Sequence, residues 1–297
     1  MTDYILYNPL SGNGLALENA KTLTVVSKKD TSLIDVTEIG DYKSFIDALS
    51  EDDRIILCGG DGTLNRFIND TEGIDITNEI LYCGGGTGND FLHDIGATEL
   101  SSPIRINEYI TNLPTVTVNG KTCRFLNNVG FGIDGYCCEV GDEQKKRSKK
   151  KVNYTSIAIK GLLFHFKPRG ATVTVDGQEY RYENVWLAPT MKGRFYGGGM
   201  LPTPLQDRSS ATHELSVMVM HGSGKLKTLL IFPSIFKGTH VKHQKHVAIH
   251  TGKEITVTFD TPCALQIDGE TVLNVTSYTA KACLLNGISE KNAVGSI

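Results

Sequence analysis

The sequence predicts a two-domain protein in which an α/β domain precedes a mainly antiparallel β domain. Its length of 297 residues is enough for about two domains. In the first third of the chain, short apolar runs alternate with a helical pattern and glycine-rich turns, which is typical of a parallel α/β sheet. After about residue 115, hairpin turns join short strand-like runs instead. We therefore expect a first domain over 1–117, a second over 118–280, and a C-terminal segment, 281–297, whose return to the first domain is left open.

The first domain has four predicted strands, each a short apolar run bounded by turn residues. They lie at residues 4–7, 23–26, 54–58 and 79–83. Residues 42–49 carry apolar side chains at helical spacing and predict a helix between the second and third strands. Helical connections of this kind allow the strands on either side to run parallel.

Two dipeptides predict β-hairpins in the second domain. Asn119-Gly120 and Asp176-Gly177 each separate two strand-like runs, and both dipeptides favour the positive φ angles of tight two-residue turns. The predicted strands lie at 115–118, 122–126, 171–175, 179–185, 215–220, 254–259, 264–267 and 272–276, and one helix is predicted over 153–166.

Composition excludes several classes of protein. Hydrophobic residues make up 40% and charged residues 21% of the chain, which argues against a disordered or fibrous protein. A formal charge of −3 gives no electrostatic reason to expect nucleic-acid binding. The seven cysteines are odd in number and lack C-x-x-C spacing, so they predict a reducing compartment. We find neither a signal-peptide pattern nor an apolar run of about 20 residues, and we expect a cytoplasmic protein.

Three glycine-rich loops that follow predicted strands carry the strongest functional signal. They read N-P-L-S-G-N-G at 8–14, C-G-G-D-G-T-L-N at 58–65 and G-G-G-T-G-N-D-F at 84–91. Small residues let backbone N–H groups approach a phosphate, and loops at strand carboxyl ends meet in the usual ligand crevice of an α/β sheet. Asp61 cannot bind phosphate directly, but it can hold Mg²⁺ or its waters.

Two common nucleotide motifs are excluded. The sequence has no G-x-x-x-x-G-K-[ST] motif, so it has no Walker A loop. Leu17 and Phe91 occupy the positions where a dinucleotide fingerprint needs a third glycine or alanine.

The order of these motifs resembles the diacylglycerol kinase catalytic-domain family, which is related to sphingosine kinases and more distantly to NAD kinases. The resemblance is closest to small soluble bacterial lipid kinases of the DgkB and YegS type and covers nearly the whole chain. It rests on the loops at 59–63 and 86–91, the N-terminal loop at 8–12, the stretch N-V-G-F-G-I-D at 128–134 and Q-I-D-G-E at 266–270. It implies a three-layer α/β nucleotide-binding domain, a β-sandwich lipid-substrate domain and an active site in the cleft between them.

The resemblance also implies residue roles and cofactors. ATP would be the phosphate donor and Mg²⁺ the metal, organised by Asp61 and Asp90 directly or through water. The implied nucleotide-binding residues are Asn8, Pro9, Ser11, Gly12, Asn13, Thr37, Gly59, Gly60, Asp61, Gly62, Thr63, Asn65, Gly86, Thr87 and Asn89. Glu270 would be the general base, and Asp268 would support the metal or orient that base. By itself Asp268-Gly269 is also typical of an ordinary hairpin turn, and Asp134 either joins the polar network or is a solvated loop residue.

Two positions depart from the family pattern. Arg66 replaces a glutamate after G-D-G-T-x-N, and it either clamps the phosphates or points to solvent. His213-Glu214 replaces the Asp-Gly of a segment that forms a structural Mg²⁺ site in the family, and Asp207 lies out of register. We therefore do not assign that second metal site.

Three segments bear on contact with a membrane. A basic run, expected in a loop before the helix at 153–166, is either a solvated surface or an attachment to anionic lipid. Each cation near such a lipid surface contributes on the order of 1 kcal/mol. Its cations are Lys145, Lys146, Arg147, Lys149, Lys150 and Lys151. Residues 237–253 hold four histidines whose strand-like surroundings disfavour a zinc site, and we expect a cationic surface there. The apolar run 229–236 either lines an acyl-chain slot, inserts into a bilayer or packs in the core.

We thus expect an ATP-dependent kinase that phosphorylates a hydroxyl group of a diacylglycerol-like lipid at a membrane surface. The alternatives are a sphingoid-base, phosphatidylglycerol or NAD kinase, or a non-catalytic protein that binds nucleotide or lipid. The expected partners are ATP and lipid but no nucleic acid, the expected location is peripheral on a membrane, and homodimer formation is left open.

Overall fold

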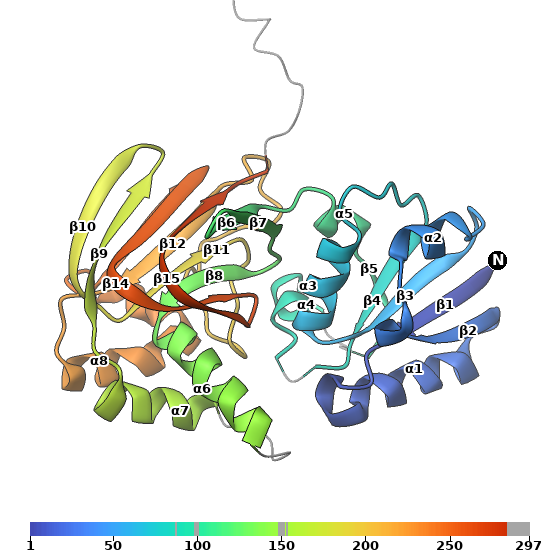
Figure 1. The fold of residues 1–297 in the computed structure, drawn as a ribbon, viewed down its shortest axis with the longest axis horizontal. Helices are drawn as coiled ribbons and strands as arrows, with labels where there is room; N and C mark the ends of the chain where they lie inside the picture. The colour runs from blue at the N-terminus through green and yellow to red at the C-terminus, as the bar shows by residue number, and fades with distance from the viewer. Residues whose placement is uncertain (87, 98–100, 148–151, 153, 284–297) are drawn as a thin grey trace, which may run out of the picture.

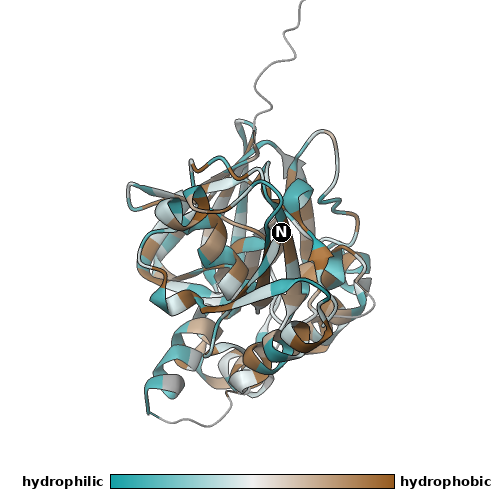
Figure 2. Cartoon of the chain, turned by 90° about the vertical axis from the view of Figure 1, so that its right-hand side faces the viewer, coloured by the Kyte–Doolittle hydropathy of each residue, from teal (hydrophilic) through white to brown (hydrophobic). Residues whose placement is uncertain are grey.

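The protein consists of two layered domains that lie side by side (Figure 1). The computed structural model describes residues 1–283 except for 87, 98–100, 148–151 and 153. Figure 2 shows hydrophobic and hydrophilic residues alternating along the same helices and strands, as expected for elements that bury one face.

The first domain is built on a five-stranded sheet of order β2-β1-β3-β4-β5. The first four strands run parallel, and the short β5 is antiparallel to β4. The strands are β1 (Thr2–Tyr7), β2 (Asp30–Asp35), β3 (Arg54–Gly59), β4 (Glu79–Gly84) and β5 (Ile104–Arg105). The parallel arrangement confirms the predicted fold class and brings the loops after β1, β3 and β4 to one edge of the sheet.

Helices cover both faces of this sheet, which makes the domain three-layered. Ala20 of α1 packs with Ile5 and Ile56 on one face, while Phe67 of α3 and Phe91 of α4 pack on the other. The helical elements are η1 (Ser11–Gly14), α1 (Leu15–Val26), η2 (Val36–Glu38), α2 (Tyr42–Asp47), α3 (Asp61–Asp70), α4 (Asp90–Asp94) and α5 (Asn107–Ile110).

One predicted strand was wrong. Residues 23–26 form the last turn of α1, and the second strand comes later, as β2. Thr24, Val25 and Val26 have high strand propensity, but a weak local preference yields to the packing of the helix on the sheet. Val25 is 83% exposed, so this β-branched residue lies on the solvent side of the helix rather than in a core strand.

The second domain is an antiparallel sheet that bends over itself into a sandwich. Its central path is β13-β12-β11-β8-β14-β15-β6-β7, and β9 joins β14 to β10. The long strand β14 changes register between Thr258 and Leu265, so that one part of it pairs with β9 and the other with β8. The strands are β6 (Thr115–Val118), β7 (Lys121–Arg124), β8 (Asn128–Gly132), β9 (Arg169–Val175), β10 (Gln178–Val185), β11 (Leu187–Met191), β12 (Leu215–Met220), β13 (Val247–Gly252), β14 (Glu254–Ile267) and β15 (Glu270–Lys281).

Both predicted hairpins form, with positive φ angles at their Asn-Gly and Asp-Gly turns. The strand β6, at the end of the predicted first domain, pairs with β15 in the second sheet. The chain therefore crosses between domains before Thr115. Of the C-terminal segment, Ala282 still hydrogen-bonds to Lys253 of the second domain, and residues 284–297 lie outside the described part of the chain.

Helices of the second domain gather on one side of its sheet (Figure 1). They are α6 (Ile133–Arg147), α7 (Tyr154–Lys160), η3 (Gly161–His165), α8 (Lys225–Ile231), η4 (Phe232–Lys237) and η5 (Thr239–Lys242). Residues 145–147 were expected in a loop, but they are the last residues of α6. The predicted helix over 153–166 is α7 followed by a π-helical turn, η3.

Candidate active site

A cleft between the two domains encloses a cavity of about 1010 Å³. Its nucleotide half is polar and lies against the glycine-rich loops, with Ser11, Gly60, Asp61, Gly86 and Asp90 in its wall. Its acceptor half lies against the helices of the second domain. The apolar lining there is Ile133, Cys137, Cys138, Val152, Tyr154, Ala158, Tyr196, Met200, Phe232 and Phe236. One cavity thus has a polar, glycine-rich lining from the first domain and a largely apolar lining from the helices of the second.

The three glycine-rich loops touch one another at this edge of the first sheet. Gly12 has a φ of +60°, and a Cβ there would lie 1.9 Å from the carbonyl oxygen of Gly85. A Cβ on Gly86 would lie 2.4 Å from the Cα of Gly60. Because no side chain fits at these contacts, glycine is required for the loops to close around a common space.

Polar side chains fasten these loops to one another. Asn8 donates through Nδ2 to Thr63 Oγ1 at 3.0 Å and accepts from the Leu10 amide. Asn89 has a φ of +52° and exchanges hydrogen bonds with the backbone of Gly86. Of the predicted nucleotide-binding residues, six line the cleft: Ser11, Gly12, Gly60, Asp61, Gly62 and Gly86.

Asp61 and Asp90 face the same small space. Asp61 begins α3 and accepts hydrogen bonds from the backbone amides of Asp90 and Phe91 at 2.9 and 3.0 Å. Asp90 accepts from the amides of Gly198 and Gly199, both at 2.8 Å. Burial, together with the charge of Asp61, raises the pKa of Asp90 to about 6.

The two carboxylates, Asp61 and Asp90, suit a Mg²⁺ ion that keeps several water ligands better than one whose ligands all come from the protein. A Cβ on Gly88 would lie 3.4 Å from Asp90 Oδ2 and 3.6 Å from Asp61 Oδ2. Both carboxylates are therefore close to the same position beside Gly88. Among the described residues no cluster of three or more acidic, histidine or cysteine side chains surrounds it. Mg²⁺ commonly keeps several waters and takes one or two carboxylates plus substrate phosphates, which fits this pair.

Asp268 lines the cleft and also lies in the contact between the domains. It is in a two-residue hairpin turn, with φ of +46°, and it accepts from the amides of Leu126, Asn127 and Asn128. Asn65 of α3 donates to its Oδ2 at 2.6 Å, which ties the first domain to the turn. Burial raises the pKa of Asp268, while the hydrogen bonds it accepts lower it.

Glu270 and Asp134 have opposite surroundings. Glu270 is the first residue of β15, is exposed, and does not line the cleft. Asp134, in the first turn of α6, lines the cleft and is buried. It accepts from the Gly135 amide at 2.9 Å and, at 3.5 Å, from Gln266 Nε2. Burial raises the pKa of Asp134 to about 7, so it belongs to the polar network of the cleft.

Sequence reasoning missed an ion-paired group that joins the domains. Asp94 of α4 accepts from Arg208 Nε at 2.7 Å and from Arg194 Nε at 2.9 Å. Arg208 is buried and also donates to the Leu126 carbonyl and to Asn127 Oδ1. Asn127 in turn lies 3.5 Å from Asp61 Oδ1. An isolated Asp in a helix and an Arg in a loop give no pattern that sequence reasoning could have recognised.

Some predicted site residues lie elsewhere. Thr37 is exposed, bonds to Asp35, and does not line the cleft. Arg66 is exposed and does not line the cleft. Of its two alternatives, the structure therefore favours a side chain that points to solvent over one that contacts the phosphates. Thr87 and Lys149, Lys150 and Lys151 lie outside the described residues.

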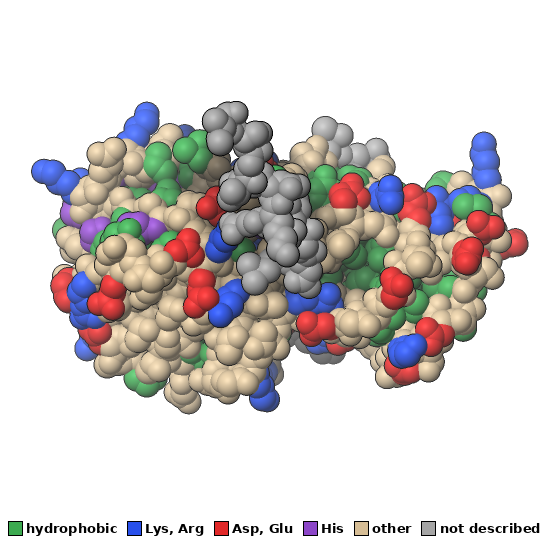
Figure 3. All heavy atoms as spheres, turned by 90° about the horizontal axis from the view of Figure 1, so that it is seen from above, with side chains coloured by type: hydrophobic (Ala, Val, Ile, Leu, Met, Phe, Trp, Pro, Cys, Tyr) green, Lys and Arg blue, Asp and Glu red, His purple; other side chains and the backbone are tan. Residues whose placement is uncertain are grey.

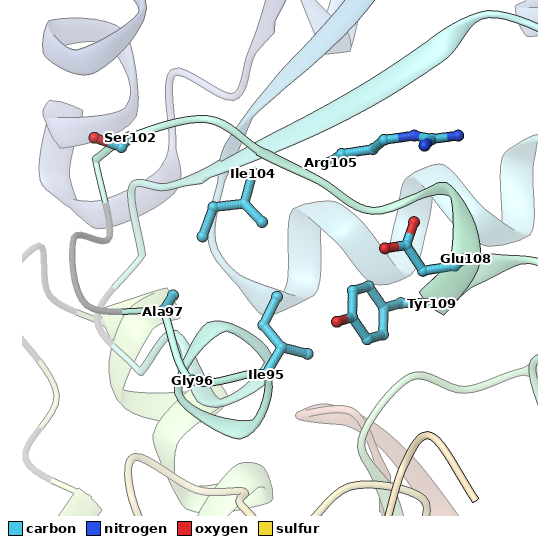
Figure 4. Close-up of a pocket in the computed structure, with 8 residues that line it drawn as sticks. All are labelled: Ile95, Gly96, Ala97, Ser102, Ile104, Arg105, Glu108 and Tyr109. Atoms are coloured by element: carbon cyan, nitrogen blue, oxygen red, sulfur yellow. The ribbon is translucent and has the colours of Figure 1, made fainter.

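A second hollow, of about 520 Å³, lies behind α4 and beside β5 and α5 (Figure 4). Ile95, Ile104 and Tyr109 contribute apolar surface to it, and Arg105 and Glu108 are at its rim. None of its lining residues belongs to the three glycine-rich loops, which instead contribute to the larger cleft.

The four histidines near residues 240–250 do not form a metal site. His240 bonds to the Pro202 carbonyl, His246 to the His221 carbonyl, and His250 to the Tyr182 hydroxyl. Each of these three rings thus has a separate partner in the sheet or its connections. Among the residues that the structure describes, no group of three or more His, Cys, Asp or Glu side chains could hold a metal ion.

Comparisons with known proteins cover both domains. The diacylglycerol kinase catalytic domain matches residues 3–118, and the YegS C-terminal NAD kinase beta sandwich-like domain matches residues 127–282. A diacylglycerol kinase from Mycobacterium tuberculosis is 27% identical over 252 residues, which cover 80% of this chain and 79% of that relative. A crystal structure of a diacylglycerol kinase from Bacillus anthracis has a TM-score of 0.62 at 20% identity, covering 95% of this chain and 94% of that one. The two-domain fold is shared over nearly its whole length.

Proposed function

The chain belongs to the diacylglycerol kinase family and is a lipid kinase, and on that premise we propose that it transfers the γ-phosphate of Mg-ATP to a hydroxyl of a diacylglycerol-like lipid. The observation that carries the proposal is the division of one cleft into a polar half and an apolar half. Phosphoryl transfer needs the nucleotide and the acceptor hydroxyl to meet in line, and a single cleft with both kinds of lining would allow this.

The nucleotide half would hold the phosphates on backbone amides. The N-terminus of α3 and the loops around Gly12, Gly60 and Gly86 supply N–H groups and positive potential without a cationic side chain. Asp61 and Asp90 would hold hydrated Mg²⁺, which neutralises charge on the phosphates when bound. Hydrogen bonds from the Gly198 and Gly199 amides keep Asp90 in place across the domain contact.

The acceptor half would hold the lipid. Ile133, Met200 and Phe232 give it an apolar wall, and Asp134 and Gln266 add polar groups to the lining of the cleft. Acyl chains favour the apolar wall because burying hydrocarbon surface is worth roughly 25 cal/mol per Å². The same wall also suits sphingoid bases or phosphatidylglycerol, so the headgroup must be identified by experiment.

Two carboxylates can take the proton from the acceptor hydroxyl. We propose Glu270 as the general base, because the D-G-E motif implies it and its neighbours Asp268 and Gly269 line the cleft. Its exposed side chain would have to turn toward the acceptor. Asp134 is the second candidate, because it already lines the acceptor half and its pKa of about 7 suits proton transfer near neutral pH.

Two variants separate these candidates. Glu270→Gln should reduce lipid phosphorylation about 100-fold, the usual range for loss of a general base, and leave ATP binding unchanged. Asp134→Asn should then mainly raise the KM for the lipid. Single-turnover phosphate transfer and nucleotide binding would be measured on both proteins. A larger loss of kcat in Asp134→Asn, with Glu270→Gln near the parent, would move the base to Asp134.

The function itself is tested by transfer of radiolabelled phosphate from Mg-ATP to a mixed lipid extract, with NAD in a parallel reaction. A labelled lipid is expected, and its chromatographic identity would name the acceptor. Label only on NAD would place the activity with nucleotide kinases. Binding of ATP without any product would favour a non-catalytic nucleotide or lipid binder.

The location proposed for the enzyme is the cytoplasmic surface of a membrane. No described helix is both long enough and apolar enough to cross a bilayer. The acceptor is a bilayer lipid, so the enzyme must reach it from water. Lys146 and Arg147 are exposed at the end of α6, and we propose that the basic run they belong to contacts anionic lipid.

A further inference from the structure

Large apolar side chains are exposed together on one side of the second domain. Phe164 of η3 is 71% exposed, and Leu226 and Leu230 of α8 are 75% and 78% exposed. The two leucines are four residues apart and share a face of the helix. The elements are in contact, and Lys225 Nζ donates to the carbonyl of Leu163 at 3.1 Å. We call Phe164, Leu226 and Leu230 the apolar ridge.

Two partly exposed aromatic residues of the cleft lining lie on elements joined to the apolar ridge. Tyr154 of α7 and Phe236 of η4 are 40% and 44% exposed, and both line the acceptor half. η4 follows α8 directly, and α7 runs into η3. The elements that carry the ridge therefore also carry part of the cleft lining.

The elements that carry or adjoin the ridge are cationic. Lys160 of α7, Lys225 and Lys227 of α8 and Lys237 of η4 are exposed, and α7, η3, α8 and η4 contain no Asp or Glu. The acidic residues of the helical side lie on the neighbouring α6, as Glu139, Asp142 and Glu143. The opposite face, seen in Figure 3, has acidic and basic side chains interspersed.

This combination selects the kind of partner. A second copy of the chain in a two-fold contact would place the same cations opposite one another, which is repulsive. An anionic bilayer offers negative charge to the lysines and hydrocarbon to the ridge, the arrangement of membrane-surface helices. Single exposed leucines are ordinary on protein surfaces. Here, however, three large apolar side chains lie on elements that contact one another and that carry only basic charged residues.

We propose that the apolar ridge inserts into the surface of an anionic bilayer, with the surrounding lysines on lipid phosphates and the cleft mouth between Tyr154 and Phe236 at the membrane. The proposal rests on the proposed lipid kinase function, because it explains how an acceptor with acyl chains enters the cleft without crossing water. It places the membrane contact on α8 and η3, beyond the basic run at the end of α6.

The test compares two triple variants of the full chain. Phe164→Ser with Leu226→Ser and Leu230→Ser removes the ridge. The matched control, Val25→Ser with Leu205→Ser and Leu273→Ser, removes three apolar side chains that are 83%, 98% and 53% exposed elsewhere. Binding is measured by co-sedimentation with vesicles of phosphatidylcholine and 30% phosphatidylglycerol.

We expect the ridge variant to bind these vesicles about tenfold or more weakly, since several buried apolar groups are lost, and the control to bind like the parent. Parent binding should also fall about tenfold or more on pure phosphatidylcholine vesicles. Equal binding by both variants, or no vesicle binding by the parent, would overturn the proposal. A parent dimer in solution that the ridge variant dissociates would instead assign this face to a second copy.

Activity distinguishes this proposal from the proposed function. The ridge variant should lose activity on lipid in vesicles through a higher apparent KM, yet match the parent on a short-chain acceptor dispersed in detergent. Loss of activity on both substrates, with vesicle binding retained, would mean a structural role and overturn the proposal. If the parent protein binds vesicles through the ridge and yet phosphorylates no lipid, that result would support the proposed membrane contact and contradict the proposed kinase function.

Discussion

Two carboxylates, the half-buried Asp268 at the contact between the domains (the domain seam) and the buried Asp134 in the acceptor half of the cleft, differ in how many hydrogen bonds they accept. At the seam, Asp268 accepts hydrogen bonds from three backbone amides and Asn65. In the acceptor half, Asp134 accepts one short backbone hydrogen bond and a long one from Gln266. A fully partnered carboxylate holds structure together, while one with unused acceptor capacity costs stability and can serve a substrate.

The largest effect expected from this difference is on stability at Asp134. Its pKa is raised from 3.8 to about 7, so the folded protein holds this proton more tightly than the unfolded chain does. Its contribution is therefore unfavourable once pH exceeds about 4, and it worsens until about pH 7. Asp134→Asn should be more stable than the parent at pH 8 by up to about 4 kcal/mol, and equal to it near pH 4.

Urea unfolding at several pH values measures this difference. The same substitution at an exposed carboxylate, Asp47→Asn, is a control that should show no such trend. A stability difference that stayed constant from pH 4 to pH 8 would show that Asp134 is not buried with a raised pKa.

The next effect concerns the seam. Arg208→Ala removes the buried partner of Asp94, and two further acceptors, the Leu126 carbonyl and Asn127 Oδ1, lose a donor. The free energy of unfolding should therefore fall by about 3 kcal/mol. Arg181→Ala breaks an exposed pair with Asp260 and should leave stability nearly unchanged. Denaturant unfolding of both variants checks this. Equal losses would mean that the seam is no more important than a surface ion pair.

The smallest of these effects should follow Asp268→Asn. The amide keeps one acceptor oxygen but turns a donor toward backbone N–H groups, so the variant should lose about 2 kcal/mol of stability. Unlike Asp134→Asn, it should be destabilised at every pH between 5 and 8. Thermal unfolding across that range measures it. If the variant melted at the same temperature as the parent, Asp268 would not be important for stability, and its predicted role in supporting the metal or the base would be favoured.

The local elements could largely be predicted, since they depend on patterns a few residues long. Asn119-Gly120 and Asp176-Gly177 specify their hairpins because few other dipeptides accept two positive φ angles. Residues 23–26 show the limit, because β-branched residues also end helices when the opposite face packs on a sheet. The boundary at β6 could not be predicted, since its partner β15 lies some 160 residues later in the chain.

The candidate site divides in the same way. The loops at Gly12, Gly60 and Gly86 are recognisable because close backbone contacts demand glycine, and that demand is visible in the sequence. Asp268 was expected to support the metal or the base, but its partners come from Leu126–Asn128 and Asn65, which only folding brings near. The exposure of Glu270 and the burial of Asp134 were likewise outside the reach of spacing arguments.

The sequence by itself determined the fold class, the phosphate-binding loops and the family, because each depends on residue types at short, fixed spacing. Only the tertiary structure decided which carboxylates are structural, how Arg208 and Asp94 join the domains, and that Phe164, Leu226 and Leu230 share a surface. Those properties depend on which distant segments meet and how much water remains between them. Hydrogen-bond satisfaction and burial are set by the packed molecule, and no local pattern encodes them.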